Sequence, residues 1–213
     1  MNCKPILFSE SMVEQLLDLK KSQTRRVIKK QPIDIIPFRG DLACVRWVAL
    51  DQIDPEPRAS IVGCRYGKPG DRLWVRETWG YVPMTAYRAS VGVVQTINPN
   101  DKYMAAIYKA GFDRAGSFRW RPSIHMPRWA SRIILEIEFV GVQRVQHITE
   151  RDAVEEGVAR GFYVRDTLDG QEMVQTSYRD GFKAKWNEIN EKRGFGWDAN
   201  PWVWVIGFRV VKP

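Results

Sequence analysis

The sequence contains only two histidines, at positions 125 and 147, and three widely separated cysteines, at positions 3, 44 and 64. No His-x-Glu pattern and no Cys-x-x-Cys pattern occurs. Zinc proteases and zinc deaminases depend on ligand sets of that kind, so both classes are excluded and we expect no metal site. An odd number of scattered cysteines also builds no disulfide framework, which favours the reducing cytoplasm.

Several other signatures are missing. The sequence has no glycine-rich phosphate loop of the Walker or Rossmann kind and no Gly-x-Ser-x-Gly nucleophile elbow, so we expect no bound cofactor. It has no apolar run of about 18 residues, and its first residues lack the apolar core of a signal peptide. We therefore expect a cytoplasmic protein without a membrane partner.

What is present is an ordinary globular composition with an excess of positive charge. The 213 residues are 44% hydrophobic and 27% charged, which suits one domain with a substantial core. The formal charge is +8, and such an excess favours an anionic partner, of which nucleic acid is the commonest. The nine tryptophans are core or pocket-wall residues in most proteins, although tryptophan also stacks on bases.

Hydrophobic periodicity predicts many strands and few helices, hence an α+β fold built on a small closed or half-closed β-barrel with peripheral helices. Strands are expected at 4–8, 23–28, 43–50, 72–79, 103–108, 130–145 and 202–211. Helices are expected from Ser9 or Ser11 to about 20, from Thr149 to 157, and from Ser177 onward. The Pro- and Gly-rich stretch 31–69 is interpreted as an excursion from the barrel, so 1–213 forms a single domain.

Local patterns define faces and helix starts. Ser11 and Glu14 have the spacing of a capping box, and Thr149 has Asp152 in the corresponding position. In the strand at 130–145, alternation places one set of apolar residues on a single face, namely Ile133, Leu135, Ile137 and Phe139. The helix after Ser177 carries the apolar stripe Tyr178, Phe182, Trp186 and Ile189.

A dense basic element follows the first helix, from Lys20 to Arg26. Alternation along an extended segment would put Ser22, Thr24 and Arg26 on one face. Lysine activates a neighbouring hydroxyl when burial or a second cation lowers its pKa, so Lys21 and Thr24 are candidates for nucleophilic catalysis. The alternative interpretation is a solvated basic loop.

The run "PILFSESMVEQLLDLKKSQTRRV" resembles the opening of ASCH-domain proteins, which commonly show a strand, a helix and a Gly-Arg-Lys-Thr-x-Thr-x-Arg-like segment. Further similar stretches are "GDRLWVRETW" at 70–79, "ITERDAVEEGV" at 148–158 and "PWVWVIGF" at 201–208. The stretches "RPSIHMPRWASRI" and "GWDANPWVWVI" are similar to larger ASCH proteins of phages and prophages. The resemblance implies a PUA-like barrel with inserts at about 31–69, 80–129 and 159–176.

The small bacterial N4-acetylcytidine amidohydrolases are the best understood enzymes that the chain resembles. By motif, their lysine falls on Lys21, their threonine on Thr24 and their glutamate on Glu156. Thr24 would attack the amide carbonyl, Lys21 would take its proton, and Glu156 would orient the lysine. Glu155 competes with Glu156 for this role, since adjacent helical residues face about 100° apart. The chain has Leu19-Lys20 where the family has Gly-Arg before the lysine, and Ser22 where it has threonine after it. It is also about twice as long as the small amidohydrolases, so its substrate is left open.

The superfamily is also similar to RNA-binding PUA domains, and some members are implicated as ribonucleases. In this second hypothesis a basic cleft binds RNA, with arginines on phosphates and tryptophans on bases. The candidates are Arg25, Arg26, Arg76, Arg119, Arg121 and Arg128, with Trp79, Trp120 or Trp129. Solvated arginines and core tryptophans are the alternative. A third hypothesis is a phage accessory protein that recognises a modified base in DNA.

Two further residues stand out. Glu77 shares a strand face with Leu73 and Val75, so it would be a buried carboxylate that needs a partner, and we expect it to line the pocket with Lys21. His125, between two apolar residues, is interpreted as a structural hydrogen bonder and not as a base.

Overall fold

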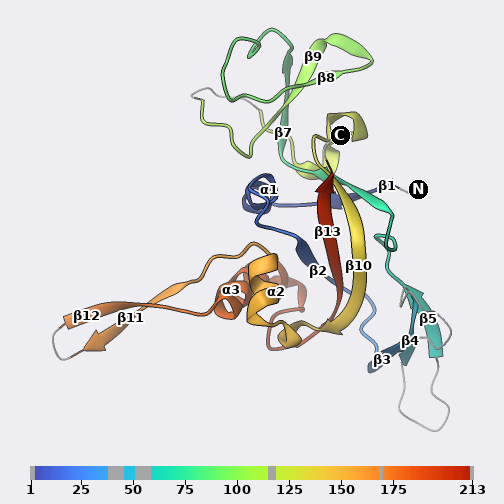
Figure 1. The fold of residues 1–213 in the computed structure, drawn as a ribbon, viewed down its shortest axis with the longest axis vertical. Helices are drawn as coiled ribbons and strands as arrows, with labels where there is room; N and C mark the ends of the chain where they lie inside the picture. The colour runs from blue at the N-terminus through green and yellow to red at the C-terminus, as the bar shows by residue number, and fades with distance from the viewer. Residues whose placement is uncertain (1–2, 38–45, 51–58, 115–118, 168–169, 212–213) are drawn as a thin grey trace.

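The computed structural model describes residues 3–37, 46–50, 59–114, 119–167 and 170–211. These residues form a mixed α+β protein in which strands outnumber helices (Figure 1). The α-helices are α1 (Glu10–Leu17), α2 (Glu150–Glu155) and α3 (Tyr178–Asn190), and the short 3₁₀ helices are Ser123–His125, Arg128–Ala130, Val145–His147 and Glu191–Arg193. The strands are β1 (Cys3–Leu7), β2 (Gln23–Val27), β3 (Asp34–Pro37), β4 (Arg46–Leu50), β5 (Ala59–Gly63), β6 (Arg72–Arg76), β7 (Trp79–Pro83), β8 (Thr96–Asn98), β9 (Asp101–Tyr108), β10 (Ile134–Arg144), β11 (Phe162–Thr167), β12 (Gly170–Gln175) and β13 (Trp202–Val211).

A five-stranded sheet in the order β1-β6-β10-β13-β2 forms the body of the protein. Strands β1 and β6 pair in parallel, whereas β10 pairs antiparallel with both β6 and β13, and β13 pairs antiparallel with β2. The long strands β10 and β13 run side by side through the centre (Figure 1). Strands β1 and β2, which α1 connects in sequence, form the two edges of the sheet. Among the described residues these edges do not pair, so the sheet is not closed into a barrel.

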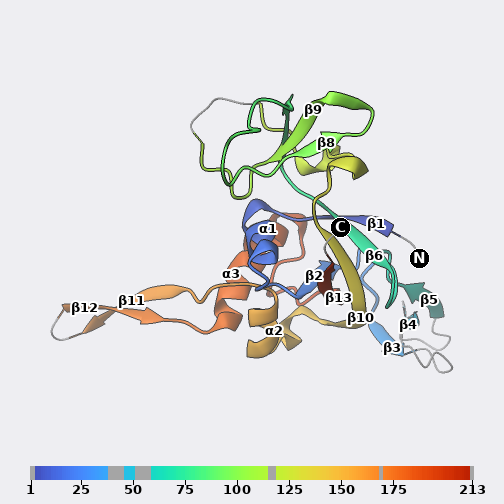
Figure 2. The same cartoon turned by 45° about the horizontal axis from the view of Figure 1, so that its top comes forward.

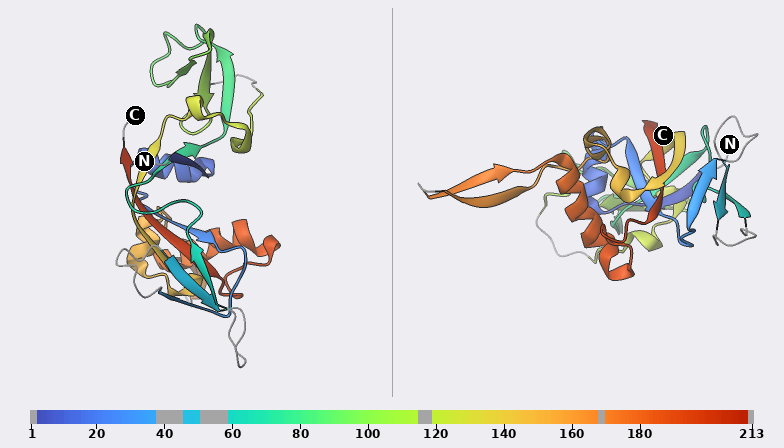
Figure 3. Two further views of the ribbon diagram at one scale, coloured as in Figure 1. Left: turned by 90° about the vertical axis from the view of Figure 1, so that its right-hand side faces the viewer. Right: turned by 90° about the horizontal axis from the view of Figure 1, so that it is seen from below.

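Three small sheets extend from this body. They are β3-β4-β5, β7-β9-β8 and the hairpin β11-β12, and they lie within the segments 31–69, 80–129 and 159–176 or begin at their edge. In Figure 2 the β7-β9-β8 sheet lies at one end of the molecule and the hairpin projects to the side. The views in Figure 3 show the same separation, with the hairpin extending well beyond α3. The periodicity of the sequence did not predict β3, β5, β8, β11 or β12.

Two apolar clusters hold the body together. The larger one packs α1 against the five-stranded sheet and includes Ile6, Leu16, Leu73, Leu135 and Phe208. The second lies between the sheet and the helix pair α2 and α3, and it includes Ala153, Phe182, Trp186, Val203 and Val205. The stripe predicted for α3 is confirmed at Phe182 and Trp186, each 5% exposed, whereas Tyr178 is only partly buried and Ile189 is 38% exposed. Because α3 packs on α2, the end of α2 is held beside β2, and this positions the candidate site.

The helix starts follow local capping chemistry in two cases out of three. Reciprocal capping boxes join Thr149 to Asp152 at α2 and Ser177 to Asp180 at α3. The predicted box at Ser11 is wrong, because α1 begins one residue after Ser9 and has no side-chain cap. The first helical turn therefore already contains Ser11, whose side chain cannot serve as an N-cap there.

Two strand predictions also need correction. The strand expected at 72–79 breaks after Arg76, and β7 starts at Trp79 in a different sheet. In β10 a bulge between Ile137 and Phe139 shifts the register against β13. An inserted residue reverses the facing of those beyond it, so Phe139 is 44% exposed and Val140 is buried in its place. The expected strand at 43–50 begins at Arg46, and positions 43–45 lie outside the described residues.

No helix in the described part of the chain is both long enough and apolar enough to span a membrane.

Candidate functional site

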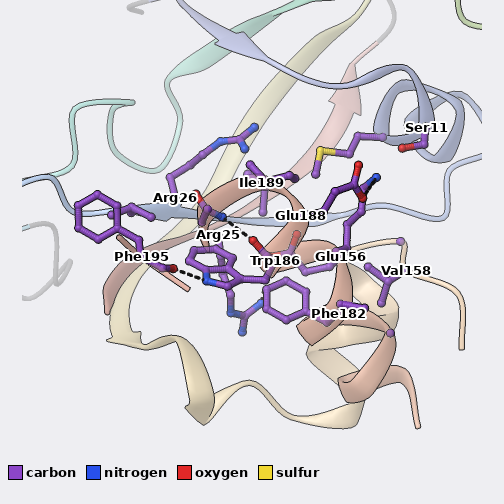
Figure 4. A pocket seen from close by; sticks show the side chains of 18 of the residues that line it. Ser11, Arg25, Arg26, Glu156, Val158, Phe182, Trp186, Glu188, Ile189 and Phe195 are labelled. Atoms are coloured by element: carbon purple, nitrogen blue, oxygen red, sulfur yellow. Dashed lines mark hydrogen bonds and ion pairs between the residues drawn. The ribbon is translucent and has the colours of Figure 1, made fainter. Parts of the chain in front are cut away.

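A cavity of about 770 Å³ opens between β2, α1, α3 and the turn that follows α2. Phe182, Trp186 and Ile189 of α3 form an apolar wall, and Glu156 at the end of α2 contributes a carboxylate (Figure 4). Thr24 of β2 also lines the cavity. The indole N–H of Trp186 donates to the carbonyl of Phe195 at 2.8 Å, which fixes the plane of the ring. The cavity thus combines aromatic surface with a hydroxyl and a carboxylate.

Lys21 does not line the cavity but contacts Glu156, which does, and its ammonium group is completely enclosed. Its Nζ donates to Oε2 and to the backbone carbonyl of Glu156, each at 2.7 Å, and the side chain of Glu156 is 4% exposed. Burial is the main cause that lowers the pKa of Lys21, while the charge and hydrogen bond of Glu156 act in the opposite direction. The net shift is downward, which brings the neutral amine closer to physiological pH.

Two turns bring these residues together. Leu19 has a positive φ of 57°, and this reversal lets the N–H groups of Lys20 and Lys21 both bond to the carbonyl of Gln15. Gly157, at φ 74°, ends α2, and a Cβ there would lie 3.1 Å from the Cβ of Lys21 and 3.0 Å from that of Gln15. A side chain at position 157 would therefore press on the segment that carries Lys21.

Arg25 supports Glu156 from the other side. Its Nη1 lies 3.2 Å from Oε1 of Glu156, and its Nη2 lies 3.2 Å from Asp152. Nη1 also donates to Gln23 at 2.6 Å, and Oε1 of Gln143, when it faces Arg25, accepts from Nη2 at 2.7 Å and from Nε at 3.0 Å. This guanidinium is thus engaged by Gln23, Glu156, Gln143 and Asp152, so it is not available for the phosphate contact predicted for it. Arg25 acts instead as a positioning residue.

Glu156, and not Glu155, reaches Lys21. Glu155 accepts from Gln23 Nε2 at 3.1 Å and from Arg151 at 3.0 Å, on the outer side of the helix end. The two adjacent carboxylates therefore point to different partners, as helical geometry requires.

Thr24 is 1% exposed as a residue and contributes to the cavity lining. Its hydroxyl makes no hydrogen bond to Lys21 or Glu156 in this structure, although all three residues are described. Catalytic hydrogen bonds commonly shorten only in the substrate complex, and a single water molecule is able to connect a hydroxyl group to a base that it does not touch directly. The structure therefore groups the three predicted residues in one place, with Lys21 and Glu156 in direct contact and Thr24 at the surface of the cavity.

Glu77 does not line this cavity, contrary to expectation. It is 1% exposed and makes a bidentate ion pair with Arg132, whose Nε and Nη2 lie 2.9 and 2.8 Å from the two carboxylate oxygens. Arg132 also donates to the carbonyl of Ala110 and lies 4.1 Å over the ring of Tyr108. Burial raises the pKa of Glu77, and Arg132 partly opposes that shift. This network ties the β7-β9-β8 sheet to the start of β10.

The other predicted binding residues form a separate group. Trp79 and Trp129 pack together with Tyr81, and the guanidinium of Arg121 lies 5.1 Å from the Trp79 ring centroid. Arg76 donates to backbone carbonyls of Ile124 and Met126. None of these residues lines the cavity. Of the predicted arginines, only Arg25 and Arg26 do, while Arg119, Arg128 and His125 are exposed elsewhere.

The sequence analysis missed several residues of the cavity. Arg65 and Tyr66 come from the segment 31–69, and Arg193 and Phe195 follow α3. Their positions carry no periodic or motif signal, because each lies in an irregular connection that only the folded chain places beside β2.

Neither a protein-family model, nor a curated protein, nor a solved structure matches this chain. The buried lysine–carboxylate pair and the cavity beside it are therefore what any assignment of function has to explain.

Proposed function

We propose that this chain is an ASCH protein whose five-stranded sheet is a half-closed PUA-like barrel, and that it hydrolyses the amide of a modified nucleoside of the N4-acetylcytidine type. The observation that carries the proposal is the enclosed contact of 2.7 Å between Lys21 and Glu156, next to a cavity lined by Thr24. A lysine freed of water is a suitable general base, and threonine is a suitable nucleophile.

In the proposed reaction Oγ1 of Thr24 forms a bond to the acetyl carbonyl carbon, and its proton passes to the neutral amine of Lys21. The tetrahedral intermediate then breaks its bond to N4 of the base, which takes that proton from the Lys21 ammonium group. The acetyl-threonine ester reacts with water, which supplies OH to the acyl carbon and returns a proton to Thr24. The products are acetic acid, which ionises in solution to acetate and a proton, and the base with a free amino group, so all atoms and charges balance.

Glu156 and Arg25 control the charge of the base. Glu156 stabilises the ammonium form that appears during the reaction, and Arg25 holds that carboxylate in place at 3.2 Å. The aromatic wall of Phe182 and Trp186 offers a face for the pyrimidine ring.

The test is release of acetate from N4-acetylcytidine by the purified protein, followed by chromatography of the cytidine product. Turnover that saturates with substrate supports the proposal. A preparation that is folded by circular dichroism and releases no cytidine over hours would remove the amidohydrolase hypothesis.

The pH dependence gives an independent check. Lys21 has to be neutral to accept a proton, so kcat/KM should rise with pH through the lowered pKa of this lysine. Glu156 raises that pKa, so Glu156→Gln should move the rising limb of the profile to lower pH even where the maximal rate falls. A Glu156→Gln profile with its limb at the same or a higher pH would show that Lys21 is not the titrating base.

A non-catalytic function is the second candidate, namely an RNA- or modified-base-binding module. It is favoured by the exposed Arg121, which lies over the rings of both Trp79 and Tyr81 on the β7-β9-β8 sheet. Such a module would bind oligonucleotides with an affinity that falls steeply with salt, and Arg121→Gln would weaken it.

A further inference from the structure

The charges that line the cavity are unequal. Six basic side chains contribute to it and two acidic ones, which leaves an excess of four positive charges. The basic residues are Arg25, Arg26, Lys29, Arg65, Lys185 and Arg193, and the acidic residues are Glu156 and Glu188.

The two carboxylates are already paired with two of the cations. Glu156 lies 3.2 Å from Arg25, and Glu188 lies 2.8 Å from Lys185. The other four cations form no ion pair with any carboxylate among the described residues. Four such charges at one cavity repel one another, and an anion would relieve that repulsion.

These four cations converge from three parts of the chain. Arg26 and Lys29 belong to β2 and the segment after it, Arg65 comes from the 31–69 segment, and Arg193 follows α3. Burial lowers the pKa of Arg26, and the charges of Tyr66 and Glu156 partly oppose that shift. Arg26 keeps its position by donating to the carbonyl of Leu7 at 2.7 Å and lying 4.9 Å over the ring of Phe8.

The cations also stand in a fixed relation to the candidate nucleophile. Thr24 and Arg26 are two residues apart on β2, and both line the cavity. Alternate residues of a strand share a face and are separated by about 6.5 Å. The aromatic wall, Thr24 and the group of cations therefore line a single cavity.

We propose that the ligand of this cavity is phosphorylated: a nucleotide whose base packs against Phe182 and Trp186 and whose phosphate is held by Arg26, Lys29, Arg65 and Arg193. Arginine is well suited to this, since its planar fork of donors matches phosphate oxygens. The proposal rests on the proposed function for the reaction at the base, but the phosphate subsite is testable without turnover.

The experiment compares the binding of cytidine and cytidine 5′-monophosphate by isothermal titration calorimetry at one ionic strength. We expect the monophosphate to bind at least about tenfold more tightly, because charge-assisted hydrogen bonds contribute more than neutral ones. Equal dissociation constants for the two ligands would overturn the proposal.

Variants test where the preference arises. The double variant Arg65→Gln/Arg193→Gln should reduce the preference for the monophosphate by about tenfold or more, with a smaller effect on cytidine. Lys183→Gln removes one charge from an exposed position of α3 outside the cavity and should leave the preference unchanged. If Lys183→Gln reduces it as much as the double variant does, the effect is net charge and the subsite is refuted.

A dinucleoside monophosphate, which has a phosphodiester but no terminal phosphate, distinguishes the two sources of phosphate. If the dinucleoside monophosphate binds as tightly as the mononucleotide, the cations hold the phosphodiester backbone of a nucleic acid. If it binds more weakly, they hold the terminal phosphate of a free nucleotide. Phosphate preference without hydrolysis of any acetylated substrate would retain the subsite and remove the amidohydrolase. Hydrolysis of the acetylated substrate without a preference for phosphate would retain the amidohydrolase and remove the phosphate subsite.

Discussion

Replacing Thr24 with valine should lower acetate release from N4-acetylcytidine by about 10³-fold or more. Valine keeps the β-branched shape that suits an enclosed strand position and removes only the hydroxyl group that would attack the substrate. The loss should appear in kcat, because a nucleophile acts in the transition state and contributes little to binding of the ground state. The measurement is steady-state kinetics on a protein whose thermal midpoint matches the wild type.

Three further variants make this result specific. Lys21→Met should lower kcat by a similar factor. The double variant Lys21→Met/Thr24→Val should lose no more kcat than either single variant, because nucleophile and base act as one unit. Thr24→Ser should recover part of the rate, since it restores a hydroxyl group. Ser22→Ala, at an exposed position of the same segment, is the control and should leave turnover intact. A Thr24→Val protein that keeps a tenth of the wild-type kcat would exclude a threonine nucleophile.

The second large effect concerns stability. Arg132→Met should lower the free energy of unfolding by about 3–5 kcal/mol, because it leaves the carboxylate of Glu77 enclosed without its counter-charge. The bidentate contact and the donation to Ala110 are lost together. Replacing both partners, as in Glu77→Leu/Arg132→Met, should recover much of the loss, since an apolar pair needs no compensation.

The pH dependence of that loss has a definite sign. Burial raises the pKa of Glu77 in the folded protein, and Arg132 opposes that shift. The Arg132→Met substitution should therefore raise the pKa of Glu77 further. An acid whose pKa is raised by folding favours the folded state at low pH and loses that contribution as the pH rises through its folded-state pKa. Denaturant titrations should therefore show a larger deficit at pH 8 than at pH 5.

A matched control exists for this prediction. Arg209 pairs with Glu136 at 2.8 Å on the surface, and Arg209→Met should leave the denaturation midpoint almost unchanged. An Arg132→Met protein with the same midpoint as the Arg209→Met protein would mean that Glu77 is neutral or hydrated, and that the pair does not stabilise the link between β6 and β7.

The sequence by itself determined the features that depend on neighbours along the chain. Thr149 and Ser177 each have an aspartate three residues later, and both form the capping boxes that start α2 and α3. The apolar run of β13 was predicted with its bounds, Trp202–Val211, and the α+β class followed from the balance of such patterns. Lys21 and Thr24 became candidates because they stand together in the basic element after the first helix, and the resemblance assigned their roles and added Glu156.

Only the tertiary structure decided how distant positions meet. Lys21 and Glu156 are 135 residues apart, and the contact forms because α3 holds the end of α2 against the chain that leaves α1. The partner of Glu77 is Arg132, 55 residues away and just before β10, which alternation around Glu77 could not indicate. The bulge that turns Phe139 outward depends on register with β13. Periodicity reports which face a residue occupies, whereas pairing, register and the convergence of charges on a cavity depend on contacts between segments that the sequence separates.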